Sequence, residues 1–238
     1  MQKDKKSFIA IITARAGSKG IKNKNLRLLD KKPLINYTLN AAKKSKFIKD
    51  IFVSTDGKEI KSFCLSKKIK VIDRPKYLSG DVIMPDASVL YTLKYLIKTG
   101  YDFDNVVFLQ PTSAIRKKND IDNAIKKFKR GGYDSLFSGV NLHPILWTFS
   151  KKKVLPLNFN FKRRPRRQSF KKDIIIENGS IYIARKKIWL KYKNRFGGKV
   201  GYYQMDSNSV HEVDEIHDIE LISHILKKNY ARKAQIIK

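Results

Sequence analysis

The chain has 238 residues, and its 52 lysines and arginines outnumber 21 aspartates and glutamates, which gives a formal net charge of +31. Hydrophobic residues make up 42% of the chain, enough to build a core, which excludes wholesale disorder. The single cysteine, Cys64, excludes an internal disulfide and a zinc site built from several thiolates, and it fits a cytoplasmic location. No apolar run approaches the roughly 20 residues of a membrane-spanning helix, so no membrane segment is expected.

The basic charge first suggests a nucleic-acid-binding protein. Of the 52 basic residues, 40 are lysines, and they are scattered through every segment of the chain. Scattered lysines are typical of solvated surfaces in proteins from compositionally biased genomes. A basic nucleic-acid-binding protein on an α/β scaffold therefore stays an alternative, and nucleic acid is not the expected partner.

Short apolar segments rich in β-branched residues alternate along the chain with segments of helical periodicity. Strands are predicted at 8–13, 51–53, 71–72, 106–109 and 135–140. Helices are predicted over 33–46, around 60–64, over 89–97 and over 121–128. This alternation predicts right-handed βαβ units, and hence a Rossmann-like α/β fold with a mainly parallel sheet flanked by helices. Further strands are predicted at 180–184 and 200–204, and a closing helix is predicted over 216–228.

The regular pattern loosens over residues 142–173. This segment contains three prolines, several aromatic residues and a dense basic run over 162–172. Aromatic side chains beside basic ones are typical of a subunit interface or a ligand lid. We therefore expect a small insertion that forms a homodimer, with a solvated loop as the simpler alternative for the basic run.

A polar loop over residues 14–25 separates the first predicted strand from the first helix. Ligands of open α/β sheets bind at the carboxyl ends of the strands, where this loop lies. Gly17 and Gly20 allow close approach of the backbone, and Arg15, Lys19 and Lys24 supply positive charge. The loop matches neither GxxxxGK[ST] nor GxGxxG. It predicts a triphosphate site of another type, with an ordinary βα loop as the alternative.

The loop resembles the signature of the CMP-sialic acid synthetases, the N-acylneuraminate cytidylyltransferase family, which is A-R-x-G-S-K-G-(I/L)-x-x-K-N. Four further segments resemble this family in the same order along the chain: VSTD at 53–56, RP and LSGD within 74–81, LQPTSxxR at 109–116 and ENGSIYI at 177–183. The resemblance spans residues 8 to about 222, and five ordered motifs are far more specific than one. The SKGI sequence at 18–21 favours the nonulosonate branch over the ketodeoxyoctonate enzymes, whose loop is of the A-S-T-R-L-P type.

The resemblance implies a single cytidylyltransferase domain over residues 1–238, with the Rossmann-like nucleotidyltransferase fold. The implied reaction joins CTP to a nine-carbon α-keto sugar acid of the sialic, legionaminic or pseudaminic type, and it uses Mg²⁺. The anomeric hydroxyl of the sugar attacks the α-phosphorus in line and pyrophosphate leaves, so positioning and charge neutralisation dominate catalysis. A nucleotide-binding homologue without catalysis is a further alternative, but it would be expected to lack Arg15 or Lys24, and both are present.

The resemblance also assigns roles to individual residues. Arg15 and Lys24 are expected to act on the phosphates as catalytic residues. The loop is further expected to contact phosphate, and Asn25 and Arg74 are expected to contact the nucleoside. Gln110 and Asn178 are expected to contact the sugar, and Arg167 is expected to contact the sugar bound to the neighbouring subunit. The expected substrate-binding residues are therefore Ala14, Gly17, Ser18, Lys19, Asn25, Arg74, Gln110, Arg167 and Asn178. An Asx turn with Gly179 is the structural alternative for Asn178, and both roles can hold at once.

Glu212 and Asp214 are the expected Mg²⁺ ligands. Residues 210–214 are predicted to form a short strand, in which alternate side chains point to the same side. Mg²⁺ prefers hard oxygen ligands and keeps several waters, so two carboxylates and the phosphates are enough. The competing interpretation is that Asp214 caps the helix that begins near Glu215.

Overall fold

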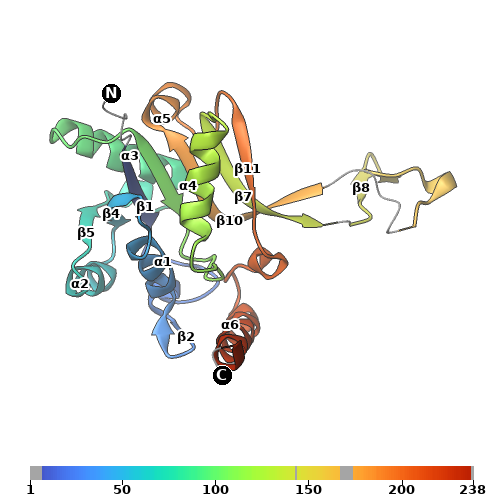
Figure 1. The fold of residues 1–238 in the computed structure, drawn as a ribbon, viewed down its shortest axis with the longest axis horizontal. Coiled ribbons are helices and arrows are strands. Elements are labelled where there is room, and N and C mark those ends of the chain that lie inside the picture. Colours follow the sequence, from blue (N-terminus) through green and yellow to red (C-terminus); the bar gives the residue numbers. More distant parts are fainter. Residues whose placement is uncertain (1–6, 143, 167–173, 237–238) are drawn as a thin grey trace.

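The computed structural model describes residues 7–142, 144–166 and 174–236. Within them, seven strands form one sheet in the order β11-β7-β10-β6-β1-β4-β5. Strand β10 is antiparallel to both of its neighbours, whereas the other neighbouring pairs are parallel (Figure 1). The strands are β1 Phe8–Thr13, β4 Ile48–Thr55, β5 Lys70–Asp73, β6 Asn105–Leu109, β7 Ser135–Leu142, β10 Ile174–Arg185 and β11 Val200–Gln204. The predicted α/β fold with a mainly parallel sheet is confirmed.

Helices cover both faces of the sheet, because the central strands are buried on both sides. Alternate residues of β1 enter different cores: Ala10 and Ile12 pack on one face, and Ile9 and Ile11 on the other. Helices α1 Leu34–Lys43, α2 Lys58–Ser66 and α4 Asp120–Arg130 supply the first core, and α3 Pro85–Lys98 and α5 Lys186–Tyr192 supply the second. The lone cysteine, Cys64, is fully buried in the first core, as expected.

A third, smaller core lies at the carboxyl ends of the strands. Helix α6, Ile216–Ile236, packs Ile222 and Leu226 against Ile21 and the small hairpin of β2 Leu28–Leu29 and β3 Lys32–Pro33. The C-terminal helix thus supports the loop that follows β1. Among the described residues, no helix is both long and apolar enough to cross a membrane.

Three differences from the sequence-based prediction fall within residues 174–214. Strand β10 is longer than predicted. It is antiparallel to β7, because the chain leaves the carboxyl end of β7 and re-enters the sheet at that same end. Helix α5 was not predicted. Residues 210–214 do not form a strand: a 3₁₀ helix spans Ser207–Val210, and irregular backbone follows it.

Residues 144–166, between β7 and β10, project from the body of the molecule as an arm (Figure 1). Its described part contains a hairpin of β8 Trp147–Ser150 and β9 Lys153–Pro156. The Trp147 ring packs edge-to-face on Phe159, with 5.0 Å between ring centroids. Arg167 lies outside the described residues. The homodimer that residues 142–173 are expected to form stays a prediction.

Candidate active site

A cavity of about 350 Å³ opens at the carboxyl end of the central strand β1, where the loop over 14–25 begins. Segments that follow β1, β5 and β6 line it, together with residues that precede α6. Among the described residues, eight of the predicted site residues line it: Arg15, Ser18, Lys24, Asn25, Arg74, Gln110, Glu212 and Asp214. This is the position at which open α/β sheets bind ligands.

The loop is held by one hydrogen bond within it and by two contacts with the chain that precedes α6. The buried Asn25 side chain, at the end of the loop, donates from Nδ2 to the Arg15 carbonyl at 2.9 Å. This bond holds the start of the loop in place. Lys24 Nζ donates to the Val213 carbonyl at 3.0 Å. Gly20 lies so close to the chain before α6 that a Cβ there would be 2.7 Å from the Asp214 carbonyl oxygen. A glycine is therefore required at position 20 by a backbone contact.

Three basic residues of the loop pair with exposed or half-exposed carboxylates. Arg15 Nη1 lies 2.8 Å from Asp81 Oδ1, and Lys19 Nζ lies 2.9 Å from Asp81 Oδ2. Lys24 Nζ lies 3.1 Å from Asp214 Oδ1. The hydrogen bond from Lys19, supported by Arg15, keeps the pKa of the Asp81 carboxyl below its ordinary value. Solvent-exposed pairs contribute little to stability, so phosphate oxygens can replace these carboxylates at small cost.

Arg74, by contrast, is locked in a buried ion pair. Its Nη2 donates to Asp56 Oδ1 at 2.9 Å and its Nη1 donates to Ser88 Oγ at 3.0 Å. The Arg74 side chain is 4% exposed and that of Asp56 is 15% exposed. Separating a buried pair of this kind leaves an uncompensated charge, so Arg74 has a fixed orientation at the cavity wall.

Glu212 and Asp214 both line the cavity, but in different settings. Glu212 Oε2 accepts a hydrogen bond of 2.9 Å from Thr112 Oγ1, and a Cβ at Gly179 would lie 2.5 Å from Glu212 Oε1. Gly179 has a φ of +61°, so both its conformation and the nearby carboxylate exclude a side chain. Burial, and then the negative charge of Asp214, raise the pKa of the Glu212 carboxyl. The two carboxylates meet at the cavity without the strand that was predicted to align them.

The capping interpretation of Asp214 is wrong in this structure. The N–H groups of Asp214 and Glu215 donate to Asp218 Oδ2, at 2.9 and 2.8 Å, so a side chain in the first turn of α6 holds the two residues that precede the helix. The Asp214 side chain pairs instead with Lys24 and is 70% exposed. Its carboxylate is therefore available to a cavity ligand.

Asn178 is not among the residues that line the cavity, and its contact with the sugar stays a prediction. Its side chain is fully buried where the register of β10 shifts against β7. Nδ2 donates to Ser209 Oγ at 2.8 Å, and Oδ1 accepts from Ser138 Oγ at 2.7 Å and from the Ser180 N–H at 3.3 Å. The last of these bonds is the Asx turn given as the alternative.

Three other predicted residues do not line the cavity. Ala14 is 1% exposed and belongs to the core, Gly17 lies in the loop away from the lining, and the Lys19 side chain is 80% exposed beside the entrance. Lys19 still reaches the site through its pair with Asp81.

Asp56, Asp81 and Thr112 lie in the motifs of the sequence without an assigned role, and Ser88 was not singled out. Asp56, Asp81, Ser88 and Thr112 all contact predicted residues. Asp56 and Thr112 follow buried strands, and that position was the available signal. Arg116 was quoted in a motif without a role. Its Nη2 donates to the Gln110 and Ser180 carbonyls at 2.9 Å each, and burial lowers the pKa of Arg116 to about 10.

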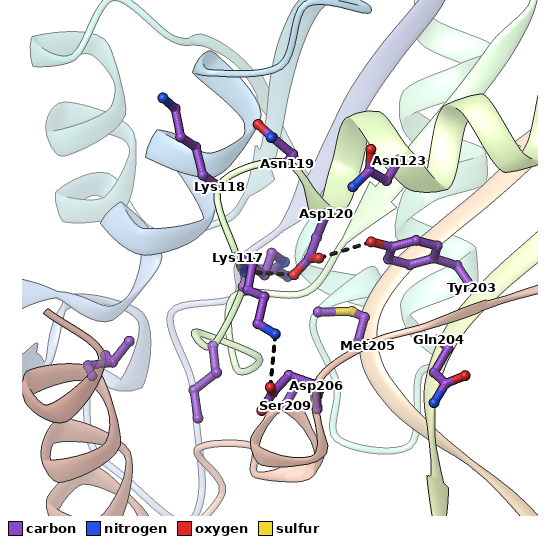
Figure 2. Close-up of a pocket in the computed structure, with 13 residues that line it drawn as sticks. Lys117, Lys118, Asn119, Asp120, Asn123, Tyr203, Gln204, Met205, Asp206 and Ser209 are labelled. Carbon is purple, nitrogen blue, oxygen red and sulfur yellow. Dashed lines mark hydrogen bonds and ion pairs between the residues drawn. The ribbon is translucent and has the colours of Figure 1, made fainter. Parts of the chain in front are cut away.

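A second cavity, of about 850 Å³, lies between the start of α4 and the end of β11 (Figure 2). Several of its polar side chains pair with one another: Lys117 Nζ lies 2.9 Å from Asp206 Oδ2, and the Tyr203 hydroxyl donates to Asp120 at 3.0 Å. Burial raises the pKa of the Asp120 carboxyl. None of the predicted site residues that the structure describes lines it. The smaller cavity is therefore the candidate active site.

Comparison with known proteins places the chain in a family. The model of the family described as "Cytidylyltransferase" matches residues 9–235, and the chain belongs to this family. It is 34% identical over 209 residues to N-acylneuraminate cytidylyltransferase A of Danio rerio, covering 86% of this chain and 47% of the relative. It is 34% identical over 222 residues to N-acylneuraminate cytidylyltransferase of Streptococcus agalactiae serotype III, covering 91% and 53%. The family predicted from the five motifs is confirmed.

The chain spans about half the length of these two curated relatives. It is 30% identical over 232 residues to the post-translational flagellin modification protein B of Campylobacter coli, covering 93% of this chain and 95% of that protein. The solved structure of CMP:2-keto-3-deoxy-manno-octonic acid synthetase complexed with CTP superposes with a TM-score of 0.71 at 13% identity, covering 94% of this chain and 99% of that one. This last likeness supports the fold alone.

Proposed function

We propose that the chain transfers the cytidylyl group of CTP to a nine-carbon α-keto sugar acid and releases pyrophosphate. The observation that carries the proposal is the convergence of Arg15, Lys24, Glu212 and Asp214 on one cavity at the carboxyl end of β1. The relatives named as N-acylneuraminate cytidylyltransferases support the same reaction. Neither the fold nor the comparisons support the nucleic-acid-binding alternative.

In the proposed reaction, the triphosphate takes the place of the carboxylates that now pair with the loop. Arg15 and Lys19 would exchange Asp81 for phosphate oxygens, and Lys24 would exchange Asp214 while keeping its bond to the Val213 carbonyl. Positive charge would thereby gather where the attacked α-phosphate and the leaving pyrophosphate develop negative charge. The sugar hydroxyl that attacks would be oriented from the Gln110 side of the cavity.

The residues present fit a bound Mg²⁺. Three carboxylates line the cavity, those of Asp81, Glu212 and Asp214, and the negative charge of Asp214 contributes to the raised pKa of Glu212, which a divalent cation would offset. In the described part of the chain, no group of three or more His, Cys, Asp or Glu side chains could hold a metal by itself. Mg²⁺ commonly takes one or two carboxylates plus phosphate oxygens. We propose that Glu212 and Asp214 hold Mg²⁺ together with the nucleotide, and that the ion supplies charge neutralisation there.

The test is pyrophosphate release with each of CTP, UTP, ATP and GTP against neuraminic, legionaminic and pseudaminic acids. We expect turnover with CTP and at least one of these acids, and none without an acid, because the hydroxyl of the acid is the nucleophile. Equal turnover with all four nucleotides would refute the specificity for CTP. No turnover with any combination would refute the reaction.

We also propose that the arm over 142–173 joins two copies of the chain into a homodimer. Apolar side chains along the described part of the arm are exposed: Trp147 is 51%, Phe149 74%, Leu157 62% and Phe161 58% exposed. Such a surface is typical of an interface core. Arg167 is proposed to reach the sugar carboxylate of the neighbouring subunit.

The dimer gives a testable result. Wild-type protein is expected at twice the 27.6 kDa chain mass in light scattering, and Phe149→Glu at the monomer mass with reduced activity. Leu65→Glu, at an apolar position on α2 that is 53% exposed, is the matched control and should stay dimeric. A wild-type monomer with full activity would contradict the proposal that Arg167 reaches the active site of the neighbouring subunit.

A further inference from the structure

Asp56 connects two sides of the candidate active site through a single oxygen atom. It follows β4, the strand beside β1, and its Oδ1 accepts from the Ala16 N–H at 3.1 Å and from Arg74 Nη2 at 2.9 Å. Ala16 belongs to the loop that carries Arg15. Arg74 lines the cavity and donates to Ser88 of α3. Asp56 itself does not line the cavity, so it acts on a ligand only through these two neighbours.

The surroundings make Asp56 hard to replace. Among the described residues, Asp56 is the carboxylate that pairs with Arg74. The other side-chain partner of Arg74 is the neutral Ser88 hydroxyl, and in this part of the chain its Nε has no partner. A buried guanidinium without a counter-ion is strongly unfavourable, so Arg74 would leave its position if Asp56 were lost. The loop is also seated here by packing, because a Cβ at Gly57 would be 3.1 Å from the Ala16 Cβ.

The carboxylate keeps its charge over the working range of pH. Partial burial acts to raise its pKa, but hydrogen bonds from Arg74 and the Ala16 amide outweigh burial and hold the pKa of Asp56 below its ordinary value. Its stabilising effect is therefore present at neutral pH and is lost only as the pH falls through that lowered pKa.

We infer that Asp56 is a positioning residue for the nucleotide, which fixes the loop over 14–25 relative to Arg74. The phosphate-binding loop and the opposite wall then present one preformed site, and the nucleotide does not have to order them on binding. The inference rests on the proposed function, because it takes CTP as the ligand of this cavity.

The first test measures CTP binding by calorimetry with Asp56→Ala and Asp56→Asn. We expect Asp56→Ala to weaken CTP binding by about tenfold to a hundredfold, the effect of losing a buried charged hydrogen bond. Asp56→Asn keeps an acceptor for the Ala16 amide and should fall between the wild type and Asp56→Ala. KM for CTP should rise more than kcat falls. Unchanged binding in both variants would overturn the inference.

The matched control is Asp73→Asn. Asp73 ends the neighbouring strand β5, directly before Arg74, and pairs with Lys61 at 2.7 Å, but its side chain is 72% exposed and does not line the cavity. CTP binding should stay within about twofold of wild type, as for an exposed ion pair. An equal loss in Asp73→Asn would show a general effect of charge and overturn the inference.

A double-mutant cycle with Arg74→Ala tests whether Asp56 acts through Arg74. Asp56→Ala should weaken CTP binding markedly less in the Arg74→Ala background than in wild type, because the two residues share one interaction. Additive losses would contradict this route.

A readout without nucleotide separates this inference from the proposed function. Amide hydrogen exchange over residues 14–20 should be faster in Asp56→Ala and unchanged over α2, since the Ala16 N–H loses its acceptor. If wild type binds no CTP, the proposed function fails while faster loop exchange still supports Asp56 as the anchor of the loop. Unchanged exchange would overturn that anchoring role.

Discussion

Arg15→Ala is expected to lower kcat/KM by about a hundredfold to a thousandfold, equivalent to about 3–4 kcal/mol of lost transition-state stabilisation. Arg15 lines the cavity, and its half-exposed pair with Asp81 leaves the guanidinium free to move to a phosphate. The charge that it supplies matters most as negative charge moves to the leaving pyrophosphate. Initial rates of pyrophosphate release at saturating Mg²⁺ measure the effect.

Lys22→Ala is the control for Arg15→Ala. Lys22 is an exposed cation in the same loop, and it does not line the cavity. Its removal should leave kcat/KM nearly unchanged. A loss below tenfold in Arg15→Ala, with an unchanged circular dichroism spectrum, would remove Arg15 from the catalytic residues.

Asp214→Asn is expected to raise the Mg²⁺ concentration needed for half-maximal rate and to lower kcat by about tenfold or more. Asparagine keeps the shape of the side chain but removes the charge that a hard cation requires. Stability should hardly change, because Lys24 keeps the Val213 carbonyl and Asp218 serves the N-terminus of α6. Mg²⁺ titrations of the rate and thermal unfolding of the same samples separate the two effects.

Asp218→Ala is expected to have the opposite effects to Asp214→Asn on stability and on the Mg²⁺ requirement. It removes the acceptor of two N–H groups at the start of α6, so it should cost about 0.5–2 kcal/mol of stability and leave the Mg²⁺ requirement unchanged. If Asp214→Asn lowered Tm while the Mg²⁺ requirement stayed constant, the metal role of Asp214 would be wrong.

The order of strands and helices was predictable where burial leaves a clear pattern. Strands β1 and β6 are buried on both faces, so they are continuous apolar runs in the sequence. The direction of β10 was not predictable, because it depends on where the arm returns to the sheet. Residues 210–214 misled the prediction because Val213 is buried between two polar neighbours, which imitates strand alternation. Its N–H bonds to the Thr112 carbonyl alone at 3.0 Å, without a ladder.

The site was predictable as a set of strand-end motifs but not as a network. Arg15, Arg74 and Gln110 come from three of the motifs and line one cavity, as expected from their places after strands. The counter-ions Asp56 and Asp81 come from segments distant in sequence, so no local pattern indicates the pairs. The buried hydrogen bonds of Asn178 to Ser138 and Ser209 also join segments distant in sequence, so its motif does not indicate them.

The most direct test of the account is a crystal structure of the protein with CTP, because it decides which cavity the nucleotide occupies. We predict the triphosphate between Arg15 and Lys24, with Asp81 displaced from Arg15 and the nucleoside on the Arg74 side. CTP bound in the larger cavity around Asp120 and Tyr203, or a triphosphate away from Arg15, would contradict the account.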